Sequence, residues 1–206
     1  MSILRKPIVL SILSGILLTL SWPAIGGMTF LIFGAFIPML LMEDELYQRR
    51  HSIHSKRIFF IAFVGFFLWN LGTTYFILYI REPDVPPIQQ TIARITAAGL
   101  TYVLNSAFMA IVFWLFHLTR RNVGGVAGYA ALVLYWMSFE YIHMQWSINW
   151  PWLNLGNVFA QDVQYVQWYE HTGSPGGTLW ILLVNLTLFT AIKARWQGRK
   201  ARSMRM

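Results

Sequence analysis

Residues 56–81, KRIFFIAFVGFFLWNLGTTYFILYIR, decide the fold of this protein. Between the basic pair at the start and the arginine at the end, residues 58–80 form one apolar run without a charge. An α-helix needs roughly 20 such residues to cross the hydrocarbon core of a bilayer. The stretch therefore predicts a transmembrane helix, and lipid is the solvent in which the rest of the chain has to be considered.

Five more apolar runs lie on either side of this stretch, and 56% of the 206 residues are hydrophobic while only 12% are charged. Such a composition is atypical of a soluble domain. Residues 1–20 also resemble a secretory signal peptide, but Ser21–Ala24 is a poor cleavage site and a second apolar run follows at once. We expect one all-α domain over residues 1–206, a polytopic integral membrane bundle of about six helices. The expected spans lie near residues 8–22, 27–42, 58–80, 92–118, 123–143 and 178–192.

The basic side chains indicate how the bundle is oriented. Of the 16 lysines and arginines, 14 fall in segments that alternate crossing would place on one side, and the other two are Arg81 and Arg94. This is the positive-inside pattern of a polytopic protein of the bacterial inner membrane. It predicts cytoplasmic termini, a cytoplasmic polar loop at Glu43–Arg57 and an external loop at Arg81–Pro87. The net charge of +8 then favours anionic lipid head groups over nucleic acid as a partner.

The external segment at residues 144–177 is rich in aromatic side chains and contains Trp150-Pro151-Trp152-Leu153-Asn154-Leu155-Gly156. An interfacial aromatic belt, which membrane proteins build routinely, would explain the composition. The order indicates more, because a proline between two tryptophans fixes a bend. We therefore also consider a re-entrant element or one that lies in the interface.

Glu140 is an ionisable residue near the outer end of the fifth expected span. A carboxylate inside a span is a functional-site hypothesis by default. The alternatives are a carboxylate that reaches the interface, or one that pairs with His143 three positions later on the same helical face. Asn70 and Tyr75 in the third span could face the same cavity, although helix–helix hydrogen bonding is the commoner role of an intramembrane asparagine.

The chain resembles the membrane domain of bacterial apolipoprotein N-acyltransferase over nearly its whole length, because several short stretches occur in the same order in both. The stretches that carry the resemblance are Leu20–Pro23, Phe67–Tyr75, Trp136–Glu140, Trp150–Gly156, Gln167–Gly173, Gly176–Trp180 and Val184-Asn185. The family's arginine after its Glu-Trp-Leu motif is His143 here. The resemblance implies transfer of an acyl chain from phospholipid to the amine of a lipoprotein's N-terminal cysteine, by an external nitrilase-like domain with a Glu-Lys-Cys catalytic set.

The chain has no cysteine, so no catalytic residue can be assigned in it, and we expect the membrane portion of such an enzyme, inactive by itself. The alternative is a non-enzymatic lipid-binding or assembly protein with the same fold. A small transporter is disfavoured, because no helix pair reads as interrupted in mid-membrane.

We expect no cofactor and no metal, since His51 and His54 have no third ligand nearby. Expected partners are membrane phospholipid and either a lipoprotein substrate or a separate nitrilase-like domain. The candidate lipid-lining or substrate-lining residues are Glu140, Trp150, Trp152, Asn154, Glu170, His171, Asn70 and Tyr75.

Overall fold

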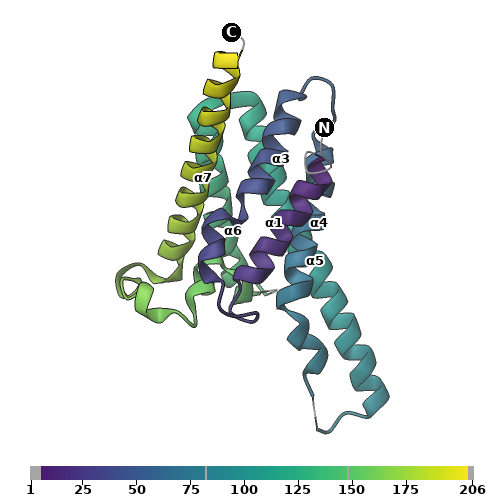
Figure 1. Ribbon diagram of the computed structural model, residues 1–206. Coiled ribbons are helices and arrows are strands. Elements are labelled where there is room, and N and C mark those ends of the chain that lie inside the picture. Colours follow the sequence, from purple (N-terminus) through teal and green to yellow (C-terminus); the bar gives the residue numbers. More distant parts are fainter. Residues whose placement is uncertain (1–5, 82, 148, 204–206) are drawn as a thin grey trace.

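The computed structural model describes residues 6–81, 83–147 and 149–203, with side chains through residue 197 (Figure 1). Within these ranges the chain forms α-helices and short 3₁₀ helices, labelled η, and no β-strand, which confirms the all-α fold class. The α-helices are α1 (Pro7–Ser21), α2 (Ile32–Ala35), α3 (Ile37–Gln48), α4 (Lys56–Thr73), α5 (Pro87–Val123), α6 (Gly125–Gln145) and α7 (Tyr169–Ser203). The 3₁₀ helices are η2 (Thr29–Leu31), η3 (Tyr75–Tyr79), η4 (Pro151–Leu153), η5 (Leu155–Phe159) and η6 (Val163–Tyr165).

Proline and glycine explain where the helices begin and end. Pro7 and Pro87 occupy the first turns of α1 and α5, where the missing N–H costs no intrahelical hydrogen bond. Helix α5 ends at Val123 and is followed by Gly124, whose φ of +66° is favourable for glycine. Helix α6 begins at the next residue, Gly125, so the two helices pack as close antiparallel neighbours.

The first and last helices have their outer ends at one end of the bundle. Figure 1 shows the start of α1 and the end of α7 at the same, upper end of the bundle, and we call this the terminal end. The turn between α3 and α4 and the turn between α5 and α6 lie there too. The opposite end, the distal end, carries the turn after α1, the η3 region and residues 149–168. The chain thus alternates in direction as the expected spans require, while the number of crossings and their orientation remain predictions.

Three helices of the described residues are long and apolar enough to cross a membrane: Lys56–Thr73, Pro87–Val123 and Tyr169–Gln197. Helix α1 is apolar but shorter. The last of these helices begins at Tyr169, well before the expected span near 178–192, and continues through a bend at Gly173 (φ +64°). The extra turns come from the segment that the sequence placed in the external loop.

The second expected span, residues 27–42, is not one continuous helix. It is divided between η2, α2 and α3, and the side chain of Asn185 from α7 is inserted at the break. The Phe36 N–H donates to Asn185 Oδ1 at 3.0 Å, and Asn185 Nδ2 donates to the Ile32 carbonyl at 2.8 Å. In an unbroken helix this N–H and this carbonyl would bond to each other. The break interrupts one expected span, and the backbone groups that it frees are bonded to Asn185.

The core around this break is aromatic. Four large side chains are fully buried and come from three parts of the chain: Phe66 and Trp69 from α4, Trp136 from α6, and Phe36 from the junction of α2 and α3. The Trp136 ring lies 5.1 Å from the ring of Phe36 and 5.5 Å from that of Phe66 (centroid distances). These large side chains fix the positions of α3, α4 and α6 relative to one another.

A network of buried charged groups joins the helices at the terminal end. Glu43 and Asp44 of α3 both bind the Arg120 guanidinium of α5; Asp44 lies 2.6 Å from Arg120 Nη2 and 2.6 Å from Lys193 Nζ of α7. Glu43 also lies 2.7 Å from His117 Nδ1. Burial would raise the pKa of Asp44, but its hydrogen bonds from Lys193 and Arg120 outweigh burial and hold that pKa below its usual value. The prediction of a polar loop at Glu43–Arg57 is therefore wrong for its first part. Residues 43–48 belong to helix α3, and Glu43, Asp44 and Leu46 are buried.

Candidate functional site

Glu140 connects three parts of the distal end. It is 5% exposed; its Oε1 accepts hydrogen bonds from Trp136 Nε1 (3.0 Å) and the Leu155 backbone N–H (2.8 Å). Its Oε2 accepts one from the Thr178 hydroxyl at 2.7 Å. One carboxylate thus binds its own helix α6, η5 and α7, a set of contacts that we call the Glu140 clasp.

The clasp holds η5 close against α7. Thr178 Oγ1, besides donating to Glu140, accepts the Gly156 N–H at 3.0 Å, and the Tyr169 hydroxyl donates to the Gly156 carbonyl at 3.0 Å. Glycine is required at position 156, because a Cβ there would collide with the Ser174 carbonyl of α7. The segment Trp150–Gly156 is therefore fixed by hydrogen bonds at its C-terminal part, and Leu153, Asn154 and Leu155 are buried.

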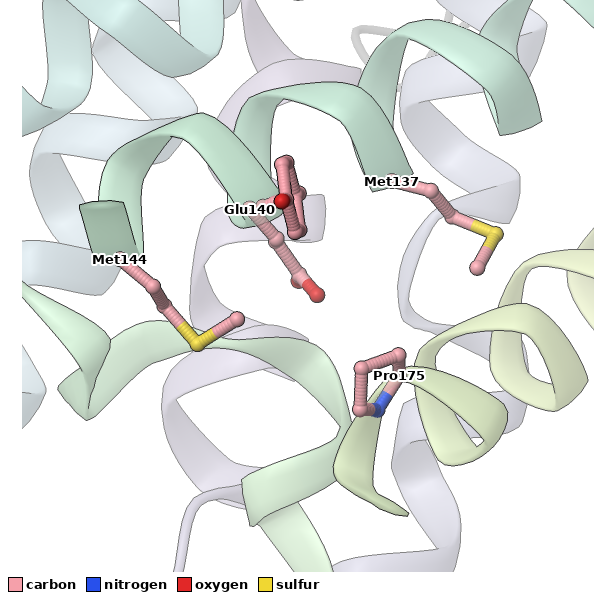
Figure 2. Close-up of a pocket in the computed structure, with 5 residues that line it drawn as sticks. Met137, Glu140, Met144 and Pro175 are labelled. Atoms are coloured by element: carbon pink, nitrogen blue, oxygen red, sulfur yellow. The ribbon is translucent and has the colours of Figure 1, made fainter. Parts of the chain in front are cut away.

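The free side of the carboxylate faces a small pocket between α6 and the start of α7. The pocket measures about 150 Å³ and is lined by Met137, Tyr141, Met144 and Pro175 besides Glu140. Figure 2 shows the Glu140 carboxylate directed into this space, with the two methionines on either side and Pro175 opposite. The walls are mainly apolar, so the pocket presents one polar group in an otherwise lipid-compatible surface.

The two alternatives considered for Glu140 are both wrong. The side chain is buried, so it does not extend to the interface. Nor does it pair with His143, which turns to α5, where its Nε2 lies 3.1 Å from Asn105 Oδ1. The His143 ring stacks on Phe139 at a centroid distance of 5.0 Å.

Three aromatic side chains meet at the distal end, and we call Phe76, Trp150 and Trp152 the distal aromatic cluster. The Phe76 ring of η3 lies parallel to Trp150, at a centroid distance of 6.3 Å and 5° between planes, and 5.5 Å from the Trp152 ring. Trp150 is half-buried, whereas Trp152 is 56% exposed. The cluster links the α4–α5 side of the bundle to the segment held by the Glu140 clasp.

The remaining candidate residues do not all belong to this site. Asn70 is fully buried, donates to the Phe66 carbonyl of its own helix at 2.9 Å and faces Met109 of α5. Tyr75 is 43% exposed and contacts Tyr79, beside the cluster but outside it. Glu170 and His171 pair with each other at 3.1 Å and point to the surface. The structure therefore brings Glu140, Trp150, Trp152 and Asn154 to the distal end and leaves Asn70 in the bundle interior.

Two residues of the clasp were missed by sequence reasoning. Trp136 lies four positions before Glu140, a spacing that puts both side chains on one helical face and that could have been noticed. Thr178 gives no such signal, because it approaches Glu140 only when α6 and α7 pack together. Among the described residues, no three histidine, aspartate or glutamate side chains come together as a metal site would require.

Comparison with known proteins shows to which family the chain is similar. The family model for the apolipoprotein N-acyltransferase N-terminal domain matches residues 14–187. Apolipoprotein N-acyltransferase of Chlorobaculum tepidum is 26% identical over 187 residues, covering 89% of this chain and 31% of that protein. The enzyme of the same name from Geobacter metallireducens is 26% identical over 196 residues, covering 92% of this chain and 34% of that protein.

The chain thus spans about a third of the length of these curated relatives. No solved structure shows a significant match. The matched residues include α6, η5 and the part of α7 that carries Thr178 and Asn185, so the Glu140 clasp lies inside the matched region. The chain belongs to the family of apolipoprotein N-acyltransferase N-terminal domains.

Proposed function

We propose that this chain is the lipid-handling membrane domain of an apolipoprotein N-acyltransferase, with both termini in the cytoplasm of a bacterial cell and the distal end at the outer leaflet of the inner membrane. In this role it binds acyl chains at the distal end and presents them to a thiol-bearing catalytic domain. The 206 residues contain no cysteine, and acyl transfer through a thioester needs a thiolate nucleophile. The stretch therefore contributes binding and no covalent chemistry of its own.

The observation that carries this proposal is the distal aromatic cluster beside the Glu140 clasp. Trp152 is 56% exposed although it packs against Phe76, and tryptophan is the side chain that membrane proteins place where acyl chains meet head groups. The clasp keeps the segment that carries Trp152 in a defined position, so the exposed ring is a preorganised contact for lipid.

The test measures binding of a synthetic diacylglyceryl-cysteine peptide to the purified chain in bilayer nanodiscs. We expect Trp152→Ala to weaken binding about tenfold, equivalent to about 1.4 kcal/mol, because a large apolar contact is lost. Trp196→Ala is the matched control, since Trp196 is similarly exposed (53%) but lies near the terminal end of α7. The control should bind as the parent chain does.

The same samples are incubated with phospholipid and analysed for N-acylated peptide, and we expect none. Turnover that persists after removal of contaminating enzyme would overturn the assignment of a binding-only role. Equal binding by the two tryptophan variants would overturn the assignment of the distal end. Binding of phospholipid without binding of the lipopeptide would favour the alternative, a non-enzymatic lipid-binding protein of the same fold.

A further inference from the structure

Helix α5 carries arginines separated by the thickness of a membrane. Arg94 and Arg120 lie 26 positions apart, which corresponds to about 39 Å along an α-helix. A bilayer with its head groups is about 40–45 Å thick. With Arg120 at the inner head-group level, Arg94 therefore lies at the depth of the outer lipid phosphates.

Arg94 differs from Arg120 in its surroundings. Arg120 is 3% exposed and binds Glu43 and Asp44. Arg94 is half-buried and bonds to its own helix, to the Gln90 carbonyl and the Thr91 hydroxyl, each at 3.3 Å. It forms no ion pair with a carboxylate within the part of the chain that the structure describes. The positive-inside pattern is carried by the other segments, so orientation of the chain does not require a cation here.

A groove of about 190 Å³ lies beside Arg94, between η3 and the first turns of α5. Its lining combines apolar walls with two longer polar side chains and consists of Ile77, Ile80, Val85, Gln90, Ala93, Arg94 and Ala97. Tyr79, next to Ile80, is 73% exposed, as expected of a tyrosine at head-group depth. The groove thus pairs an apolar channel with a guanidinium group at the level where phosphates lie.

We propose that this groove binds one membrane phospholipid, with the lipid phosphate on Arg94 and an acyl chain along Ile77, Ile80 and Ala97. Charge complementarity selects this occupant, because a guanidinium binds phosphate oxygens through paired, charge-assisted hydrogen bonds. The inference rests on the proposed membrane orientation. It goes beyond the proposed function by placing a phospholipid on the α4–α5 side, away from the Glu140 clasp.

The experiment counts phospholipids retained by the full chain. The purified protein in detergent is titrated with dioleoylphosphatidylglycerol, and bound lipid is measured by native mass spectrometry. We expect Arg94→Gln to weaken retention at least about tenfold. Arg81→Gln is the matched control, an exposed arginine on the same side of the bundle, and should bind within about twofold of the parent. Ala97→Trp fills the groove, leaves Arg94 in place and should also lose the lipid.

Two further measurements identify which part of the lipid the groove recognises. Dioleoylglycerol, which has the same chains without phosphate, should not be retained, and 10 mM inorganic phosphate should not displace the phospholipid. Equal losses in Arg94→Gln and Arg81→Gln, retention of dioleoylglycerol, displacement by inorganic phosphate, or full retention by Ala97→Trp would each overturn the proposal. No lipopeptide is present, so failure here is distinct from failure of the proposed function.

Discussion

The two ends of the bundle bury carboxylates in different ways. At the terminal end, Glu43 and Asp44 are bound by Arg120, Lys193 and His117, so charge meets charge across α3, α5 and α7. At the distal end, the donors that Glu140 finds among the described residues are all neutral, and one side of its carboxylate faces a pocket. The first arrangement locks helices together. The second holds a loop in place and leaves a polar group beside a lipid-compatible surface.

The aromatic surroundings sharpen this contrast. The Arg120 guanidinium lies over the Tyr47 ring at 4.2 Å and over the Tyr129 ring at 4.6 Å, so its remaining faces are covered. The tryptophan Trp152 at the distal end is instead largely exposed. Buried charge pairing is thus found at the terminal end, and an exposed aromatic ring at the distal end, where we propose that ligand is bound.

The largest effect is expected at Arg120. Arg120→Ala leaves two buried carboxylates without their main cation, and breaking a buried pair in this way costs about 3–5 kcal/mol. The free energy of unfolding in mixed micelles measures the loss. Arg49→Ala is the control, because the Arg49 side chain is 64% exposed in its pair with Glu45, and an exposed pair contributes only about 0–1 kcal/mol. Similar losses in both variants would remove the distinction between the two ends.

The next effect is expected at the clasp. Glu140→Ala leaves the Leu155 N–H and the Trp136 indole N–H unsatisfied in the protein, at a cost of about 3 kcal/mol in total. Hydrogen exchange followed by mass spectrometry should show faster exchange in residues 150–158, with helix α5 unchanged. Glu170→Ala, which alters a carboxylate on the surface, should exchange as the parent does. Uniform acceleration over the whole chain would mean that the clasp supports the entire bundle and not the loop alone.

A smaller effect is expected at Asn185, which lies between the two ends. Asn185→Ala removes both bonds at the helix break, yet the Phe36 N–H and the Ile32 carbonyl can then bond to each other, so we expect a loss of about 1–2 kcal/mol. The same unfolding measurement applies, with Thr187→Ala as control, since the Thr187 hydroxyl bonds only within α7 at the surface. A loss as large as that of Arg120→Ala would show that the break carries as much stability as the charged network.

The sequence predicted the helical fold because uncharged apolar runs identify membrane helices by length alone. It could not predict the break at Phe36, because the group that satisfies the freed backbone is Asn185, far away in the chain. Glu43 and Asp44 were assigned to a loop for the same reason: their partners Arg120 and Lys193 become visible only when α3, α5 and α7 pack. At the distal end, Glu140 and the tryptophans were found from residue type and order, whereas Thr178 depends on the α6–α7 contact.

The central claim is that the terminal end faces the cytoplasm and the distal end faces outward. The chain has no cysteine, so a single introduced thiol reports on one position. Ser52→Cys lies in the exposed turn between α3 and α4, at the terminal end, and Ser147→Cys in an exposed turn just after α6, at the distal end. In intact spheroplasts, a membrane-impermeant maleimide should label Ser147→Cys at once and Ser52→Cys only after permeabilisation. Labelling of Ser52→Cys without permeabilisation, with Ser147→Cys protected, would contradict the account.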